Sequence, residues 1–238
     1  MKVKTMALAA GVCTPLILSG SASGGFVGIT TTSKPNDFGL LVVNVYAVFD
    51  RPGEDSMISV AGTPMNPLHI VVENGTFYNS AFGNDRAPDP ALIDVYPSLA
   101  FDTFVSIGKK VSTGDTLIIT PGFPVGITGS SLWMDMAGWA LFPNSPQGNP
   151  FDPANSFPGN GQILIAQFST ADGTAIHGTL RIRGMSNGIE FVSIESFFQV
   201  PGPGAYALFG LAGLLRVRRR RRQPPKVQPR HTSSPRSP

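Results

Sequence analysis

Glycine and proline interrupt the central part of this chain at short intervals, which leaves little room for long helices. The sequence contains 27 glycines and 22 prolines among 238 residues, and the segments between them are rich in Val, Ile, Thr and Phe. Proline breaks helices and glycine weakens them, whereas β-branched and aromatic residues favour strands. The pattern predicts an all-β fold, an antiparallel β-sandwich of jelly-roll-like type.

Strands are expected where such a segment is bounded by turn residues. Residues 38–49 are apolar on both faces except at Asn44, which predicts the central strand of the core. The other expected strands are residues 26–32, 56–61, 68–73, 91–96, 100–107, 116–120, 131–134, 139–142, 162–170, 175–183 and 189–198.

The last three expected strands are predicted to form a three-stranded meander. Asp172-Gly173 and Asn187-Gly188, which separate them, are dipeptides that tight hairpins favour. Within 175–183 the side chains alternate, so one face of this strand is expected to be wet. The inward set is Ile176, Gly178, Leu180 and Ile182, and the outward set is His177, Thr179, Arg181 and Arg183.

Residues 1–22 have the organisation of a secretory signal peptide with a helical apolar region. Lys2 and Lys4 precede an apolar stretch at 6–18, and Gly20-Ser21-Ala22 supplies small residues before a cleavage site expected after Ala22. Cleavage would remove Cys13, the one cysteine, and leave residues 23–199 as the β-sandwich domain. That domain has no disulfide or thiol chemistry.

The C-terminal part joins a Pro/Gly hinge, an apolar helix and an arginine run, in that order. The helix, residues 205–217, would reach about 20 Å at roughly 1.5 Å per residue, less than the roughly 30 Å hydrocarbon core of a bilayer. Arginines stay on the cytoplasmic side of a membrane. The residues that carry this pattern are Val200, Pro201, Gly202 and Pro203, and then Arg216, Arg218, Arg219 and Arg220.

Residues 200–222 resemble the PEP-CTERM sorting signal. The resemblance implies recognition by an exosortase, a membrane-embedded cysteine transpeptidase, with transient anchoring by the C-terminal helix and delivery to the bacterial cell surface or exopolysaccharide matrix. Gly202 stands where the family typically has glutamate. Residues 223–238 continue beyond the arginines and are expected to be disordered because they are rich in Pro, Ser and Arg.

Charge is divided unevenly along the chain, whose formal net charge is +3. All 15 acidic residues lie within 23–199, but only seven of the 18 basic residues do. The domain is therefore acidic, and the basic residues belong mainly to the C-terminal segment. An acidic domain is not expected to bind nucleic acid.

Trp133 and Trp139 lie six residues apart, beside Phe142. If both rings were exposed on one sheet face, they could stack on sugars, as in carbohydrate-binding sandwiches. Ordinary core packing is the alternative, because aromatic side chains bury large areas.

Acidic and amide side chains gather in two long loops, residues 79–90 and 143–160. Their oxygens are candidate ligands for calcium, although neither loop has the spacing of a known calcium loop. The alternative is that they form turns and helix caps. The residues concerned are Asp85, Asp89 and nearby Asp94 for the first loop, and Asp152 and Asn155 for the second.

No catalytic motif is present, and the domain has only two histidines. His69 is expected to be half-buried in its strand, and His177 to lie on a polar face. Glu190 and Glu195 point to opposite faces of one expected strand, so they cannot be the paired carboxylates of a glycosidase.

Two hypotheses follow. The first is a non-catalytic surface or matrix protein with adhesive contacts, exosortase and the export machinery as partners, and no cofactor. The second is a secreted carbohydrate-active protein, either a binding module or a glycoside hydrolase.

Overall fold

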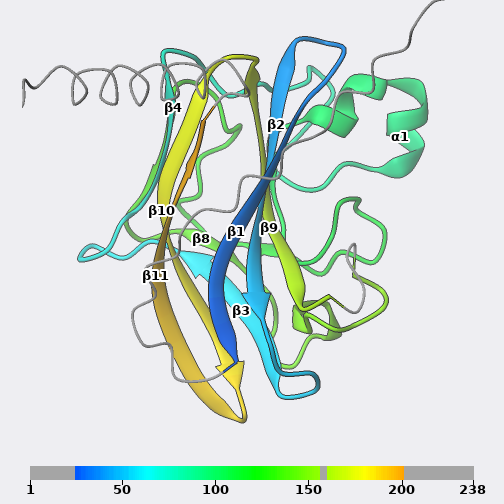
Figure 1. Ribbon diagram of the computed structural model, residues 1–238. Coiled ribbons are helices and arrows are strands. Elements are labelled where there is room, and N and C mark those ends of the chain that lie inside the picture. Colours follow the sequence, from blue (N-terminus) through cyan, green and yellow to red (C-terminus); the bar gives the residue numbers. More distant parts are fainter. Residues whose placement is uncertain (1–24, 156–159, 201–238) are drawn as a thin grey trace, which may run out of the picture. The chain divides into compact units, whose positions relative to one another are not determined.

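The computed structural model describes residues 25–155 and 160–200, which form two antiparallel sheets facing each other across one main core (Figure 1). The expected all-β antiparallel sandwich is confirmed. The smaller sheet has the order β1-β2-β9-β5, from β1 (Phe26–Pro35), β2 (Leu40–Phe49), β9 (Gln162–Ala171) and β5 (Phe104–Val105). The larger sheet has the order β6-β8-β3-β10-β4-β7, from β6 (Ile118–Ile119), β8 (Gly138–Ala140), β3 (Asp55–Ala61), β10 (Ala175–Ser186), β4 (Leu68–Glu73) and β7 (Ser131–Met134), and β11 (Ile189–Gln199) also pairs with β10.

Strand β2 lies inside the smaller sheet, between β1 and β9, as its apolar composition predicts. Val43 and Val45 face the main core, whereas Tyr46 packs on the other side of the sheet with Phe104 and Leu164. Both faces of this strand are thus largely buried. That explains why its sequence lacks the two-residue alternation of a half-exposed strand.

Strand β10 organises the larger sheet. One of its edges pairs with β11 along its length, from Ile176 opposite Gln199 to Ser186 opposite Ile189. Its other edge pairs with β4 at residues 175–179 and with β3 at residues 182–186, so β3 and β4 follow one another along the same edge. The predicted alternation of β10 is confirmed, with buried and partly exposed residues in strict succession from Ile176 to Ser186.

The predicted three-stranded meander is wrong, because β9 and β10 belong to different sheets. Asp172-Gly173 forms a turn closed by Thr174 N–H donating to the Ala171 carbonyl, and only Gly173 has a positive φ, of 89°. That is the geometry of a type II turn, which splays strands apart. Asn187 and Gly188 both have positive φ, 51° and 72°, as the type I′ turn of the β10–β11 hairpin requires.

The expected strand at residues 91–96 is a helix, α1 (Pro90–Val95). The Asp89 carboxylate accepts a hydrogen bond from Ala91 N–H at 2.9 Å, and Pro90 occupies the first turn. An Asp cap followed by proline is a strong helix start, and it outweighs the apolar residues behind it. The expected strand at 100–107 is also shorter than predicted, because the 3₁₀ helix η1 (Pro97–Phe101) precedes β5. A second 3₁₀ helix, η2 (Pro146–Gly148), lies in the loop before β9.

The signal peptide, the residues of the sorting segment from Pro201 onward and the tail at 223–238 lie outside the described residues. Val200 is described, and it directly follows the last residue of β11. Among residues 25–155 and 160–200, no helix combines the length and apolarity needed to cross a membrane.

The two tryptophans provide a test of the core. Trp139→Ala should lower the free energy of unfolding by about 3–5 kcal/mol, because Trp139 is fully buried and its indole N–H donates to the Ser106 carbonyl at 2.9 Å. Trp133→Ala is the matched control. Because Trp133 is 54% exposed, this change should alter the free energy of unfolding by about 0.5 kcal/mol or less. Urea unfolding followed by circular dichroism measures both; equal effects would contradict the assigned burial.

Candidate functional site

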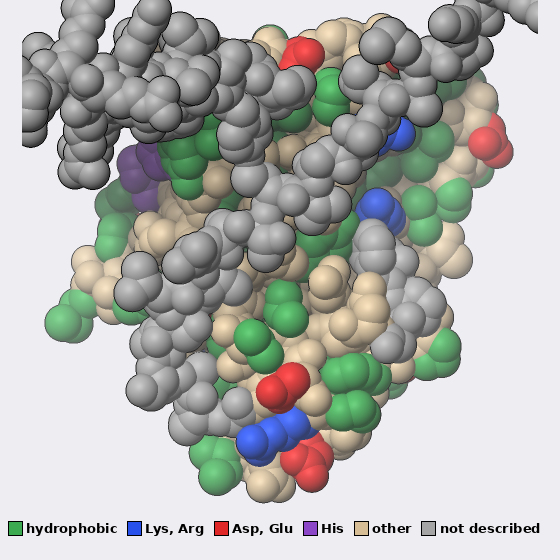
Figure 2. Space-filling model, viewed as in Figure 1, with side chains coloured by type: hydrophobic (Ala, Val, Ile, Leu, Met, Phe, Trp, Pro, Cys, Tyr) green, Lys and Arg blue, Asp and Glu red, His purple; other side chains and the backbone are tan. Residues whose placement is uncertain are grey.

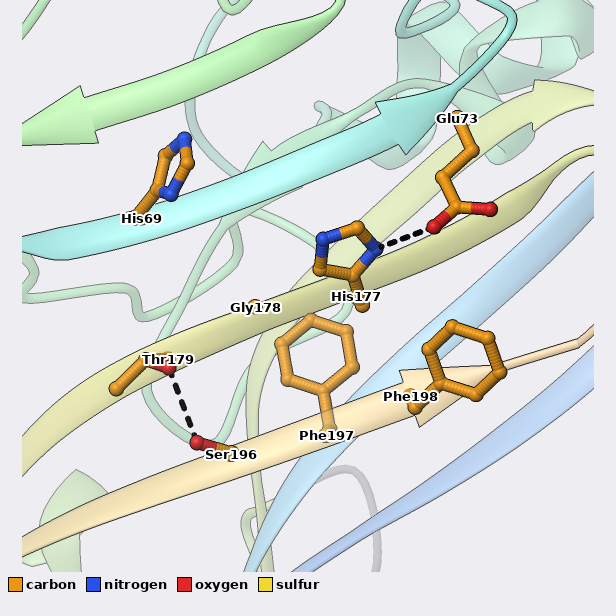
Figure 3. Close-up of a pocket in the computed structure, with 8 residues that line it drawn as sticks. All are labelled: His69, Glu73, His177, Gly178, Thr179, Ser196, Phe197 and Phe198. Carbon is orange, nitrogen blue, oxygen red and sulfur yellow. Dashed lines mark hydrogen bonds and ion pairs between the residues drawn. The ribbon is translucent and has the colours of Figure 1, made fainter.

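The outer face of the larger sheet carries the main cluster of polar and aromatic side chains that we consider functional. It includes a shallow depression of about 390 Å³ over β4, β10 and β11. Figure 2 shows histidine beside hydrophobic side chains where β4 and β10 lie. The lining residues are His69, Glu73, His177, Gly178, Thr179, Ser196, Phe197 and Phe198 (Figure 3).

Strand register brings these residues together. His177 of β10 lies opposite Phe198 of β11 and Val71 of β4. Thr179, two residues further along β10, lies opposite Ser196 and His69. Two neighbouring rows of side chains therefore cross the three strands on the same face.

The polar groups of this depression are partly paired with one another. His177 Nδ1 lies 3.3 Å from Glu73 Oε1, and the hydroxyls of Thr179 and Ser196 are 3.0 Å apart (Figure 3). The Phe198 ring lies 6.0 Å from the His177 ring, in a tilted arrangement. The depression thus offers two imidazoles, a carboxylate, two hydroxyls and an exposed aromatic ring to one ligand.

Trp133 extends this face beyond the depression. It lies in β7 opposite His69 of β4, and the residue is 54% exposed. Trp139 does not take part, because it points into the core and packs at 6.2 Å from the Phe123 ring. The hypothesis of a carbohydrate contact made by both tryptophans is therefore wrong for Trp139, because its side chain lies on the inward face of β8 and packs in the main core.

The acidic residues of the two long loops serve as turn formers and caps. Both oxygens of Asp85 accept backbone N–H groups, from Gly126 at 2.8 Å and from Ile127 at 2.7 Å. Asp89 caps α1, and Asp152 accepts from Ala154 N–H at 2.7 Å. The amide of Asn155 donates to the carbonyls of Gln147 and Asn149, and Asp94 lies exposed on α1.

These acids do not converge on a common point. Across residues 25–155 and 160–200, no three acidic, histidine or cysteine side chains group as ligands of a metal ion would. Both oxygens of Asp85 and one oxygen each of Asp89 and Asp152 accept backbone N–H groups, as the turn-forming alternative expects.

Nucleophilic catalysis has no support on the outer face. Ser196 bonds to the Thr179 hydroxyl, and no hydrogen bond joins His69 or His177 to a hydroxyl group in the described part of the chain. A nucleophile needs a base within hydrogen-bond reach. The rings and the polar groups of this face can contact a ligand by stacking and by hydrogen bonds.

Sequence reasoning missed most of this site. His69 is exposed rather than half-buried, because Leu68, Ile70 and Val72 take the inward positions of β4. That two-residue alternation was readable in the sequence. The outward position of His177 was predicted correctly, and so were the opposite faces of Glu190 and Glu195.

No family model, curated protein or solved structure matches this chain. Function is therefore inferred from the geometry of the site and from the organisation of the sequence.

A second candidate group is the carboxyl of Asp102, which lies fully buried after η1. Burial raises its pKa to about 6, although the backbone N–H groups of Ser80, Thr103 and Asn84 oppose the rise. Perturbed carboxyls often mark functional sites. Here, however, Asp102 borders no depression described above, and its Oδ1 accepts from Ser80 N–H at 2.8 Å, so it holds the loop at residues 79–90 in place.

Asp102 should make stability depend on pH in a defined window. The folded state holds this proton up to pH of about 6, whereas the unfolded chain releases it near the ordinary value of 3.8. The free energy of unfolding should therefore fall as pH rises from about 4 to 6, by at most about 3 kcal/mol from this group. Urea titrations across that range measure it. Asp102→Asn should flatten the curve and Asp89→Asn, at an exposed cap, should not; identical curves for all three proteins would contradict the assignment.

Proposed function

We propose that this chain is a non-catalytic protein, exported to the bacterial cell surface or extracellular matrix, whose sandwich binds polysaccharide through the outer face of the larger sheet. Export and sorting are supported by the signal-like residues 1–22 and by the resemblance of residues 200–222 to the PEP-CTERM signal. The last strand, β11, ends at Gln199, directly before this segment. In this proposal an exosortase processes the chain, and the C-terminal helix anchors it in the membrane until then.

The observation that carries polysaccharide binding is the combination of exposed rings and hydrogen-bonding groups on one sheet face. Trp133 and Phe198 are 54% and 53% exposed, and they flank the imidazoles, Glu73 and the two hydroxyls. An aromatic face packs against the C–H groups of a sugar ring, while the polar groups bond to its hydroxyls. Such mixed lining is typical of ligand sites.

The spacing of the rings favours a chain of sugars over a single one. Trp133 is in β7 and Phe198 is in β11, and two strands, β4 and β10, lie between them. Three strand spacings of roughly 4.8 Å give about 14 Å across the sheet. A ligand that contacts both rings must therefore extend over several sugar units.

The alternative, a glycoside hydrolase, is not favoured on this face. Hydrolysis needs two carboxyls within about 10 Å of each other. Glu73 lies opposite Ala175 at one end of β10, and Glu190 lies opposite Met185 at the other end, about 33 Å away at roughly 3.3 Å per residue. Glu190 is also held by Arg183 in a two-point ion pair, with both hydrogen bonds 2.7 Å long. The other version of the second hypothesis, a carbohydrate-binding module, is compatible with the proposal.

Polysaccharide binding can be tested with full-length protein. The probes are insoluble cellulose, chitin and the exopolysaccharide of the producing culture, in pull-down assays followed by calorimetry with soluble fragments. Trp133→Ala should weaken binding at least tenfold, because it removes a stacking surface without disturbing the core. Phe82→Ala, which removes a ring of similar exposure in the loop at residues 79–90, should have no effect. Unchanged binding by Trp133→Ala, or no binding to any probe by the unaltered chain, would contradict the proposed ligand.

Sorting is a separate test. Surface fractions from cells with and without the sorting enzyme should differ in the mass of the mature C-terminus, because the proposal requires cleavage near the Pro/Gly hinge. Mass spectrometry of the C-terminal peptide measures this. A mature chain that still ends at Pro238 in the presence of the enzyme would contradict processing and leave the polysaccharide test unaffected.

A further inference from the structure

Gly25 lies directly before β1 and is buried. Its N–H donates to the Ser186 hydroxyl at 2.7 Å, and its carbonyl accepts the Asp50 N–H at 2.8 Å. Both backbone groups of Gly25 are thus bonded to other parts of the chain. The start of β1 is therefore fixed within the fold.

The carboxylate of Asp55 lies against Gly25. Asp55 is 4% exposed, and its Oδ1 accepts the Ser186 hydroxyl at 2.5 Å. A Cβ atom added to Gly25 would lie 2.0 Å from Asp55 Oδ2, so glycine is the residue that fits beside this carboxylate. Because a Cβ is about 2.5 Å from the nitrogen of its own residue, the Gly25 nitrogen is at most about 4.5 Å from Asp55 Oδ2.

The Asp55 carboxylate forms no ion pair in the described part of the chain. Its oxygens accept from two neutral groups, the Ser186 hydroxyl and the Arg51 backbone N–H, the latter at 3.1 Å. The Arg51 guanidinium lies beside Asp50 instead, at 3.9 Å. Burial of a carboxylate without a cation is costly, because it loses water and gains no opposite charge.

We propose that signal peptidase cleaves the chain between Gly24 and Gly25, and that the new α-ammonium group of Gly25 pairs with Asp55. Such cleavage rests on the proposed export, because signal peptidase acts on exported chains. Water hydrolyses the peptide bond. The water oxygen joins the Gly24 carbonyl carbon, which becomes the carboxylate of the released peptide. Both water protons end on the Gly25 nitrogen, which becomes the ammonium group.

An ammonium group suits the place that the Gly25 N–H occupies. A peptide N–H has one hydrogen to donate, and here it goes to Ser186. An ammonium group has three, so it keeps the bond to Ser186 and directs a second hydrogen at Asp55 Oδ2. Hydrogen bonds between charged groups are stronger than those between neutral ones. Processing thus supplies the cation that the buried carboxylate lacks.

The sequence before this bond suits signal peptidase. Ala22 and Gly24 place small residues at the third and first positions before the bond, as the enzyme requires. The bond lies two residues beyond the cleavage site expected from the sequence, after Ala22. Cleavage at that earlier site leaves Ser23 and Gly24 attached, and with them a neutral peptide bond beside Asp55. Gly25 becomes buried only when β1 folds, so the bond is accessible to the enzyme before folding.

The first residue of the exported protein tests the cleavage site. Peptide mass spectrometry of the protein from surface and culture fractions should find Gly25 at the N-terminus. A chain that starts at Ser23, or at any other residue after the signal, would overturn the proposed site and leave export standing. A chain that retains Met1 in every fraction would contradict export and the cleavage together.

Thermal unfolding tests the ion pair. In a chain that keeps every residue from Gly25 to Pro238, a specific protease site takes the place of residues 18–24, so that cleavage makes Gly25 the first residue. Cleavage should raise the midpoint of unfolding by about 5 °C, because it adds a charged hydrogen bond in a domain of this size. Circular dichroism measures the midpoint before and after cleavage.

Two substitutions separate the ion pair from other effects of cleavage. Asp55→Asn keeps the shape of the side chain but removes its charge, so the rise on cleavage should disappear. Asp50→Asn is the matched control, because the Asp50 side chain is 63% exposed and the full rise should remain. Each variant is compared with its own uncleaved form, so a general loss of stability cancels. No rise in the unaltered chain, or an equal rise in Asp55→Asn, would overturn the ion pair.

Discussion

The strict alternation of β10 is the constraint on which the larger sheet depends. Ile176, Leu180 and Ile182 are fully buried and fill the core, while His177 and Arg181 take the intervening outward positions. A slip of one residue would turn these polar side chains into the core, where burial of an unpaired charge costs several kcal/mol. The burial of alternate β10 side chains therefore both stabilises the sandwich and determines which side chains lie on its outer face.

Strand positions could be predicted well from the sequence, but strand partners could not. Most expected strands are present, because alternation and turn residues are local signals. The two Gly-containing dipeptides show the limit of such signals: Asn187-Gly188 closes a hairpin, whereas Asp172-Gly173 sends the chain to the opposite sheet. Which turn type forms depends on the φ of the first residue, which is positive at Asn187 and not at Asp172.

The candidate site was less predictable, because its parts are distant in the chain. Trp133, His69 and His177 come from three strands that only pairing brings together. Trp139, six residues from Trp133, is buried instead, because β7 ends at Met134 and the next strand begins at Gly138 in a different place in the sheet. Nearness in sequence is therefore a poor guide to a shared surface once a turn intervenes.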